Sequence, residues 1–376
     1  MLAASFALAG IPRSVWALQD NEELVDFADL QGFRTELRDA SPRIRCFDLR
    51  QLTSFLTPED QFYTFHQTQA VQVNADDWRL RIRGFVDRPK DFTLDQLKTR
   101  SDKRDQAVTL ECSGNAAGPA ANGLLSNGLW SGVGLASILT ECGIKPDARE
   151  VAFFGMDVER EPGSVDAAAH GRSVYVQDAL RGDAMLALAL NRKPLSAERG
   201  FPVRLILPGW YGMTQIKWLT RIEVLDRRYE GTHMARNYHT MQVVEPRSQD
   251  FWIETSISRT RLKSVVARVT RRRQTNGDFG YRISGAAWGG QKAIRSVEVQ
   301  IDGGPWFPAQ IEKGNDAYTW LLWSFDWTNA MPGPHILVSR AIDLEGYIQP
   351  TEVEWRQIVK TARENNSQWP RKIIIP

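Results

Sequence analysis

The sequence is short of the residues that build disulfide scaffolds, zinc sites and covalently attached haem. Its 376 residues include only three cysteines, Cys46, Cys112 and Cys142. No two of them form a C-x-x-C pair, so neither a disulfide framework nor a zinc ribbon is expected. The haem-attachment motif C-x-x-C-H is also missing. These absences exclude a small fold held together by disulfides or metal.

An excess of charge of either sign is missing too. Lys and Arg number 47 and Asp and Glu number 45, which leaves a net charge of +2. So balanced a charge predicts no nucleic-acid partner and no anionic membrane surface. Apolar residues make up 42% and charged residues 24%, which is ordinary for a globular chain long enough for two domains. A small molecule is therefore the expected partner.

Long hydrophobic runs are absent, and no run reaches the roughly 20 residues that span a bilayer. The longest one covers residues 2–11, and Val15-Trp16-Ala17 follows it. This pattern is typical of the apolar core and small-residue cleavage site of an export signal that lacks its basic start. We expect residues 1–17 to be a truncated export signal, which implies a periplasmic protein. An apolar arm packed on the core is the alternative.

Mixed strand and helix signals fill the first two thirds of the chain. Strands are predicted over residues 78–86, 107–111, 201–207 and 216–224. Thr93 is placed to cap a short helix over 94–98. A second helix is predicted from Ser131 to a stop at Gly143, because the apolar residues between them recur at i, i+3, i+4 and i+7.

The pattern changes near Pro246. Short strands separated by turn residues are predicted over 263–270, 281–287, 296–301 and 335–343. This spacing predicts an all-β sandwich of about one hundred residues. Residues 364–371 look too polar for a further strand, and we expect them to wrap back over the molecule. The expected domains are therefore 18–245 and 246–376.

Cys112 is the most informative position for chemistry. The predicted strand 107–111 runs into the turn Cys112-Ser-Gly-Asn115. A cysteine on such a turn is placed to be a thiolate nucleophile or a ligand for a soft metal. A cysteine hydrolase would also need a histidine held nearby, and none of the five has a recognisable flanking signature. A buried free cysteine without chemistry is the other interpretation.

Three basic residues form a second group of candidates. Arg199, Arg204 and Lys217 lie on or beside consecutive predicted strands, and the last two interrupt apolar runs. Charges inside apolar strands either face water at a sheet edge or pair with a buried anion. Phosphate suits such a site, because Arg offers a bidentate fork and Lys a point charge.

Several motifs in one order resemble a known family. They are Leu110-Glu-Cys-Ser-Gly-Asn115, Phe154-Gly-Met-Asp157, Gly200-Phe-Pro-Val-Arg204 and the stretch 208–218. Together they resemble the sulfite oxidase family of molybdopterin-dependent oxidoreductases. Segments 285–290, 296–306 and 340–350 are similar to the family's immunoglobulin-like dimerisation domain. The resemblance implies an α+β fold, with a molybdopterin-binding domain followed by an all-β immunoglobulin-like sandwich, and a homodimer.

The resemblance also implies a site built around a molybdenum-molybdopterin cofactor. By it, Cys112 ligates the molybdenum, Tyr238 matches the family's active-site tyrosine, and Arg371 matches a C-terminal arginine that returns to the pocket. The implied cofactor-binding residues are Tyr63, Thr64, His66, Asp157, Arg199, Arg204, Gln215, Ile216 and Lys217. Arg199 stands where sulfite oxidases commonly carry a histidine.

Two departures from the family concern the substrate. Sulfite oxidases carry an arginine after the cysteine turn, where this chain has Ala116-Ala117, and another where it has Thr64. We expect oxygen-atom transfer to or from a small substrate, as in a sulfite dehydrogenase with an altered pocket. A sulfoxide or N-oxide reductase and a cofactor-free binding module are the alternatives. Without a haem motif, electrons would pass through a separate protein such as a c-type cytochrome.

Overall fold

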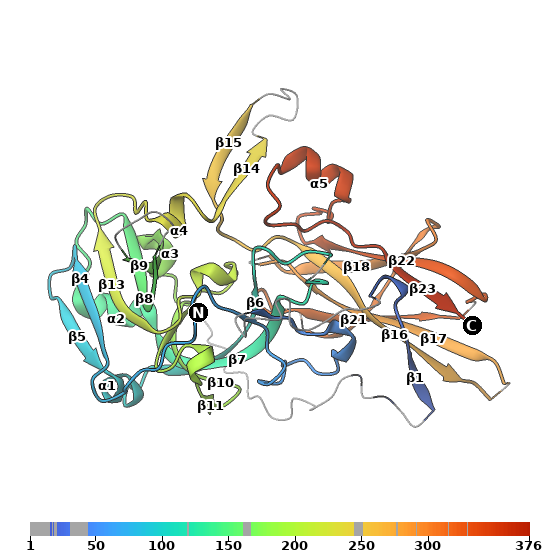
Figure 1. The fold of residues 1–376 in the computed structure, drawn as a ribbon, viewed down its shortest axis with the longest axis horizontal. Helices are drawn as coiled ribbons and strands as arrows, with labels where there is room; N and C mark the ends of the chain where they lie inside the picture. The colour runs from blue at the N-terminus through green and yellow to red at the C-terminus, as the bar shows by residue number, and fades with distance from the viewer. Residues whose placement is uncertain are drawn as a thin grey trace.

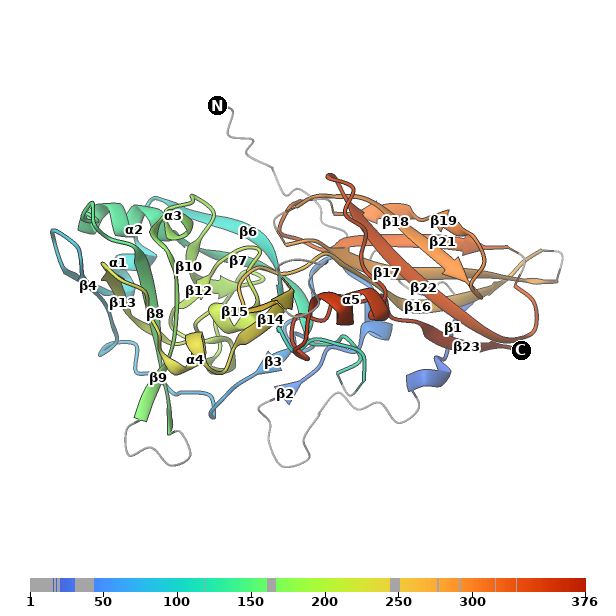
Figure 2. The ribbon, with the colours of Figure 1, turned by 90° about the horizontal axis from the view of Figure 1, so that it is seen from above.

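The computed structural model shows a molecule of two lobes (Figures 1 and 2). It describes Trp16, Leu18 and residues 21–30, 44–118, 120–160, 167–243, 251–275, 277–290, 292–314, 316–328 and 330–376. Apart from Trp16, the expected export signal over 1–17 lies outside the described residues, and so does the expected domain boundary near Pro246. None of the described helices is long and apolar enough to cross a membrane.

The first lobe is built on two five-stranded sheets. One has the order β5-β4-β13-β8-β9, with β4 (Arg79–Gly84), β5 (Lys90–Thr93), β8 (Glu150–Arg160), β9 (Ala167–Tyr175) and β13 (Leu219–Leu225). The other runs β11-β10-β7-β6 with β12 beside β10, from β6 (Lys103–Glu111), β7 (Leu125–Gly134), β10 (Met185–Leu190), β11 (Lys193–Pro194) and β12 (Arg204–Ile206). The helices are α1 (Leu94–Lys98), α2 (Leu135–Cys142) and α3 (Val176–Ala179). Thr93 caps α1 as predicted.

Helix α2 begins four residues later than predicted. Residues 131–134 continue strand β7, which is paired on both sides, with β6 and with β10. The strand passes so close to β10 that a Cβ on Gly132 would lie 2.1 Å from the Leu186 carbonyl oxygen. The prediction of a helix from Ser131 is therefore wrong, because pairing with distant strands holds these residues extended. The helix ends at Gly143, whose φ of +72° suits glycine.

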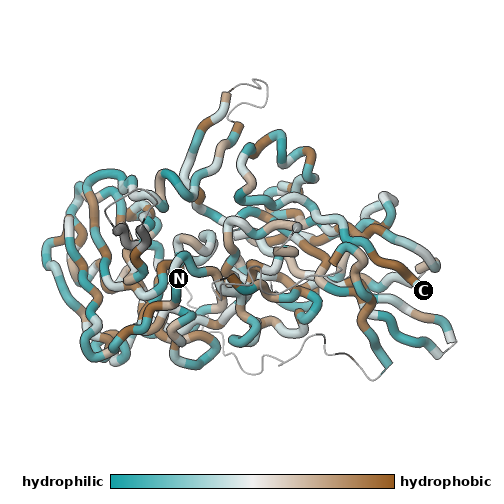
Figure 3. Tube along the Cα trace, in the orientation of Figure 1, coloured by the Kyte–Doolittle hydropathy of each residue, from teal (hydrophilic) through white to brown (hydrophobic). Residues whose placement is uncertain are grey.

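The second lobe is a β-sandwich. Its five-stranded sheet, β1-β16-β17-β21-β20, contains β1 (Glu22–Val25), β16 (Lys263–Arg273), β17 (Phe279–Trp288), β20 (Gln310–Lys313) and β21 (Leu321–Trp327). The facing sheet, β19-β18-β22-β23, contains β18 (Ile294–Ile301), β19 (Trp306–Pro308), β22 (Gly333–Asp343) and β23 (Arg371–Ile375). Hydrophobic residues recur along these strands (Figure 3), and residues of both sheets, such as Val266 in β16 and Val299 in β18, pack into one buried core. This is the immunoglobulin-like sandwich that the resemblance implied.

Both ends of the chain contribute strands to this sandwich. Strand β1, from residues expected in the first domain, pairs antiparallel with β16. Strand β23 pairs with β22, although the polar stretch ending at Arg371 was not expected to lead into a strand. The strand forms because Ile373 and Ile375 are buried in the sandwich. The polar residues before them gave no sign of this strand in the sequence. The described chain ends therefore tie the two lobes together.

The remaining elements of the described chain are short. They are β2 (Ile44–Arg45), β3 (Thr64–Phe65), α4 (Thr232–Ala235), β14 (His239–Val243), β15 (Trp252–Ser256), α5 (Glu352–Ile358) and the 3-10 turns η1 (Ala28–Leu30), η2 (Leu49–Gln51), η3 (Ala197–Arg199) and η4 (Gly212–Thr214). Strands β14 and β15 form a hairpin that projects from the body beside α5 (Figure 1).

Candidate active site

The cysteine turn stands where strand β6 ends. The Cys112 amide donates to the Leu124 carbonyl at 3.0 Å, and the Asn115 amide donates back to the Cys112 carbonyl at 2.9 Å. Burial raises the pKa of the Cys112 thiol to about 11, while a hydrogen bond from the Gly114 amide and the charge of Arg363 act in the opposite direction. The turn therefore presents a fixed sulfur with two groups that favour its thiolate.

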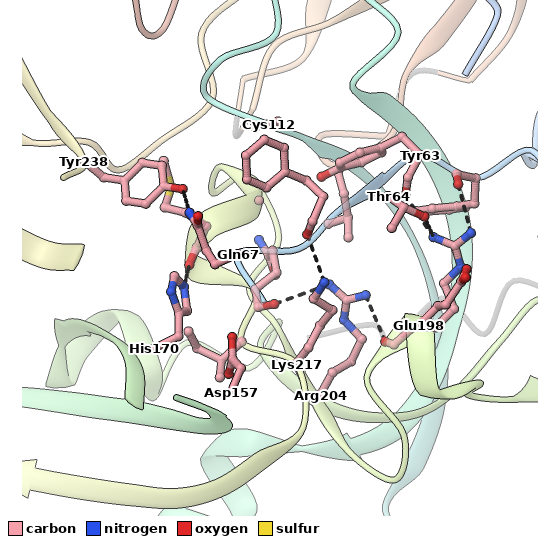
Figure 4. Close-up of a pocket in the computed structure, with 18 residues that line it drawn as sticks. Tyr63, Thr64, Gln67, Cys112, Asp157, His170, Glu198, Arg204, Lys217 and Tyr238 are labelled. Carbon is pink, nitrogen blue, oxygen red and sulfur yellow. Dashed lines mark hydrogen bonds between the residues drawn. The ribbon is translucent and has the colours of Figure 1, made fainter. Parts of the chain in front are cut away.

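Cys112 lines a pocket in the first lobe (Figure 4). The pocket encloses about 730 Å³ when the open space at its mouth is included. All the predicted site residues line it except His66 and Arg371; those present are Tyr63, Thr64, Cys112, Asp157, Arg199, Arg204, Gln215, Ile216, Lys217 and Tyr238. The structure thus brings these residues together from widely separated segments of the chain.

Arg204 is a buried cation at the pocket wall. It is 6% exposed, so the edge-strand alternative is excluded. Its Nη atoms donate to the carbonyl oxygens of Arg199 and Gln215 at 3.1 and 3.3 Å. Burial lowers its pKa to about 10, which still leaves the guanidinium charged at neutral pH. A buried charge satisfied only by carbonyl groups favours binding of an anion from outside.

Lys217 places a second basic group beside Arg204. Its Nζ donates to the Phe65 carbonyl at 2.9 Å and lies 2.7 Å from Nδ1 of His66. Burial, followed by the charge of Arg204, lowers the pKa of Lys217 well below its ordinary value. An anion between the two side chains would favour the charged lysine. His66 does not line the pocket itself but supports Lys217 from behind.

Arg199 holds the segment that contains Tyr63 and Thr64 in place. Its guanidinium donates to the Tyr63 carbonyl at 2.9 Å and to Thr64 Oγ1 at 3.0 Å, and further to the carbonyls of Glu59 and Phe62. Thr64, where sulfite oxidases carry an arginine, is thus an acceptor for an arginine of this chain. Arg199 therefore shapes the pocket wall by hydrogen-bonding to backbone carbonyls of residues 59–63.

The loop between β12 and β13 closes the pocket beneath Cys112. Gln215 bonds the Leu207 amide and carbonyl at 2.6 and 2.8 Å and the Trp210 carbonyl at 2.9 Å, which fixes the loop's curvature. A Cβ on Gly212 would lie 2.7 Å from the Tyr63 hydroxyl oxygen. Only glycine lets this loop approach the cysteine turn so closely.

Four buried polar atoms at or beside the pocket have no partner among the described residues. They are His66 Nε2, Asp157 Oδ1, His170 Nδ1 and Arg204 Nε. Buried polar atoms are normally hydrogen-bonded, so such a group around one cavity indicates a polar ligand. With a cysteine sulfur and basic groups nearby, the donor set fits a soft metal on an organic ligand that carries a phosphate.

Tyr238 marks the other side of the pocket. Its hydroxyl accepts a hydrogen bond from Gln67, and both side chains lie on the same side as His170 in Figure 4. The guanidinium of Arg363 lies 4.6 Å from the centre of the Tyr238 ring. The C-terminal tail therefore does return an arginine to the pocket region, as the resemblance implied, but at position 363.

The prediction of Arg371 at the pocket is corrected by the structure. Arg371 is 1% exposed inside the second lobe, where it donates to Asp29 at 3.0 Å and to the Val266 carbonyl at 2.9 Å. It begins strand β23, and the pairing of β23 with β22 fixes it in the sandwich. Its role is structural.

Sequence reasoning missed three residues of this region: Gln67, His170 and Arg363. Gln67 directly follows His66, which the resemblance implied as a cofactor-binding residue, so its position was a usable signal. Arg363 lies in the same C-terminal tail as Arg371. Their positions in the sequence alone could not show which of the two arginines reaches the pocket. His170 had no local signal, because its neighbour across the pocket, Met213, is 43 residues away and accepts a hydrogen bond from its Nε2.

Comparisons with known proteins agree with this geometry. Residues 66–233 match the oxidoreductase molybdopterin-binding domain, and residues 254–374 match the Mo-co oxidoreductase dimerisation domain. The chain is 29% identical over 330 residues to mitochondrial sulfite oxidase of Drosophila melanogaster, covering 80% of this chain and 56% of that protein. It is 30% identical over 310 residues to nitrate reductase [NADH] 1 of Arabidopsis thaliana, covering 72% and 33% respectively. The chain thus spans about half the length of the sulfite oxidase and about a third of the length of the nitrate reductase.

A solved structure resembles most of the chain. The sulfane dehydrogenase SoxCD from Paracoccus pantotrophus has a TM-score of 0.78 and 26% identity, over 92% of this chain and 90% of that one. Fold and site together define a molybdopterin-dependent oxidoreductase whose cofactor is molybdenum-molybdopterin. Within that class, the chain belongs to the sulfite oxidase family.

Proposed function

We propose that this protein oxidises a small reduced sulfur compound, in the manner of a sulfite dehydrogenase with an altered pocket. The substrate gains an oxygen atom from water, and two electrons and two protons leave. When bound, the molybdenum cofactor supplies the two-electron redox change and the oxygen transfer. The single observation that carries the proposal is Arg363, which extends from the tail over Tyr238 and brings a positive charge near Cys112, where it opposes the rise in the thiol pKa that burial causes.

The residues divide into two groups by position. Arg204, Lys217 and Asp157 hold the phosphate and pterin end of the cofactor, and Cys112 holds the metal. Tyr238 and Arg363 stand where a substrate oxygen or sulfur would be hydrogen-bonded, with Gln67 fixing the Tyr238 hydroxyl. Because Ala116, Ala117 and Thr64 bring no charge, Arg363 supplies the positive charge for an anionic substrate.

A reductase acting on a sulfoxide or N-oxide is the second candidate. It is favoured by the uncharged Thr64, Ala116 and Ala117, since a neutral oxide needs fewer fixed cations than sulfite. The nitrate reductases among the relatives show that this family also contains proteins named for reduction.

Assays in both directions separate the two candidates. Purified enzyme would be given sulfite, or a sulfane-sulfur compound, with ferricyanide or cytochrome c as acceptor. In parallel it would be given sulfoxides and N-oxides with reduced viologen as donor. We expect turnover with a sulfur donor, and KM to rise in Arg363→Gln. Turnover only with the viologen would contradict the proposal and support the reductase.

Further proposals concern assembly and place. A separate electron-transfer protein, such as a c-type cytochrome, would accept the electrons, because the sequence contains no haem-attachment motif. The match to a dimerisation domain supports a homodimer, with twice the 42.6 kDa mass of one chain in light scattering. The apolar segment 2–11 supports a periplasmic location, which cell fractionation would test.

A further inference from the structure

A buried ion pair connects the cysteine turn to the second lobe. Lys263, the first residue of β16, is 2% exposed, and its Nζ lies 3.6 Å from Oε1 of Glu111. Glu111 is the last residue of β6 and directly precedes Cys112. The Lys263 Nζ also donates to the Asn115 carbonyl at 2.9 Å and to the Asn365 carbonyl at 2.8 Å. One ammonium group therefore joins a strand end, a turn and the C-terminal tail.

The carboxylate of Glu111 binds the same turn from the other side. Its Oε1 accepts from Asn115 Nδ2 at 3.0 Å, and its Oε2 accepts from Nε1 of Trp288 in β17 at 2.8 Å. The Asn115 side chain also accepts from the Leu124 amide at 3.0 Å. Asn115 closes the turn that begins at Cys112. Glu111, which precedes the cysteine turn, is thus a member of the ion pair, and Asn115, which ends the turn, is hydrogen-bonded to both of its members.

The tail is held to the same turn. The Glu364 amide donates to the Ser113 carbonyl at 2.7 Å, and Asn366 Nδ2 donates to the Leu262 carbonyl at 2.9 Å. Arg363 directly precedes Glu364 and reaches Tyr238. The position of Arg363 therefore depends on the same contacts that fix the cysteine turn.

We propose that Lys263 is a positioning residue, through which the second lobe sets the placement of Cys112 relative to Arg363. Lys263 does not line the pocket among the described residues, so it acts through the turn and the tail. Lysine is suited to this place because its three donors serve two carbonyls and one carboxylate at once. A methionine would keep most of the volume and lose all three donors, which leaves buried carbonyls unsatisfied.

The test uses the full-length protein and a readout that is independent of turnover. In Lys263→Met we expect hydrogen exchange at the Asn115 and Glu364 amides, measured by mass spectrometry, to accelerate at least tenfold. The matched control is Arg268→Met on the same strand. Arg268 is also 2% exposed and donates to the Trp16 and Leu52 carbonyls, away from the turn. It should leave exchange at both amides unchanged.

A double variant keeps the test valid if Lys263→Met misfolds because Glu111 is left as an unpaired buried charge. Glu111→Gln with Lys263→Met removes both charges, so no lone buried carboxylate remains, and the faster exchange should persist. Unchanged exchange at both amides in the double variant, or equal acceleration in Arg268→Met, would overturn the proposal.

Steady-state kinetics link the positioning role of Lys263 to catalysis. This kinetic test rests on the proposed function, whereas the exchange test does not. Lys263→Met should raise KM for the sulfur substrate several-fold more than it lowers kcat, because Arg363 is displaced. An equal fall of kcat with KM unchanged would contradict this. Molybdenum content is measured beside it: a wild-type enzyme without metal would refute the proposed function, while the exchange result would still decide the role of Lys263.

Discussion

At the scale of single residues, two arginines of the C-terminal tail have different surroundings. Arg363 is partly exposed beside Tyr238 at the pocket, whereas Arg371 is enclosed in the sandwich with Asp29. The Arg371 guanidinium also lies 3.5 Å from the centre of the Phe27 ring. Replacing Arg363 should therefore affect substrate binding, and replacing Arg371 should affect the stability of the fold.

Replacing Arg363 tests its role at the pocket. In Arg363→Gln we expect KM for an anionic substrate to rise about tenfold or more, because a charge-assisted hydrogen bond contributes roughly 1.5–3 kcal/mol. The melting temperature should stay within a degree or two. Steady-state kinetics and calorimetry measure both quantities. Arg356→Gln, which removes an exposed arginine paired with Glu352 on α5, is the control. An unchanged KM in Arg363→Gln would refute the assignment.

Replacing Arg371 should give the opposite result. Arg371→Met leaves Asp29 without its buried partner, so the free energy of unfolding should fall by about 3 kcal/mol. Urea denaturation followed by tryptophan fluorescence measures the change. KM of the folded variant should match wild type, and a raised KM at unaltered stability would show that Arg371 acts at the pocket after all.

Site residues carried by short contiguous motifs could be predicted from the sequence. Cys112, Asp157, Arg204 and Lys217 all line the pocket, because each motif keeps a fixed local geometry on a strand end or loop. That they bind the cofactor stays a prediction. The two tail arginines could not be told apart, because their places depend on the pairing of β23 with β22. His170 was missed for the same reason, since its surroundings come from distant segments.

At the scale of elements, the loop carrying η4 must pass directly beneath the cysteine turn. A Cβ on Gly212 would lie 2.7 Å from the Tyr63 hydroxyl oxygen and 3.2 Å from the Glu111 carbonyl oxygen. Contacts under 3.0 Å force the loop or Tyr63 to move. A side chain there would therefore displace the pocket floor at Tyr63, which lines the pocket.

Gly212→Val should lower the molybdenum content of the purified protein by at least half, because Tyr63 and the cysteine turn are pushed apart. Metal content by mass spectrometry, normalised to protein, measures this. The matched control is Gly182→Val, since a Cβ at Gly182 meets nothing within 4 Å. Full metal content in Gly212→Val, or an equal loss in the control, would contradict the steric argument.

Most elements could be predicted because their patterns are local. The capping box of α1 follows directly from residue order, and so does the apolar, β-branched run that predicts strand β16. The start of α2 was misplaced because Ser131 to Gly134 fit either structure locally. Only the partners β6 and β10, which flank β7 on both sides, decide that these residues are extended.

At the scale of the whole molecule, buried neutral histidines make stability depend on pH. Burial lowers the pKa of His170 to about 4, from an ordinary 6.5. Between these values the unfolded chain binds a proton that the folded chain does not. The stabilisation is therefore complete above pH 6.5 and is lost as the pH falls toward 4, by up to about 3 kcal/mol.

Urea unfolding between pH 7.5 and 4.5 measures this loss. We expect the free energy of unfolding to fall on acidification, and the fall to be shallower in His170→Gln, which keeps a donor for the Met213 carbonyl. His239→Gln, on the half-exposed start of β14, is the control and should keep the wild-type slope. A slope that His170→Gln leaves unaltered would show that His170 is not the group responsible.

The central claim is that Cys112 holds molybdenum in a cofactor bound between the basic wall and Tyr238. The most direct measurement is molybdenum by elemental analysis on full-length protein from a host that makes molybdopterin, beside Cys112→Ala and the core control Cys142→Ala. We predict close to one molybdenum per chain in wild type and in Cys142→Ala, and little or none in Cys112→Ala. Wild-type metal content in Cys112→Ala, or no metal in any of the three proteins, would contradict the account.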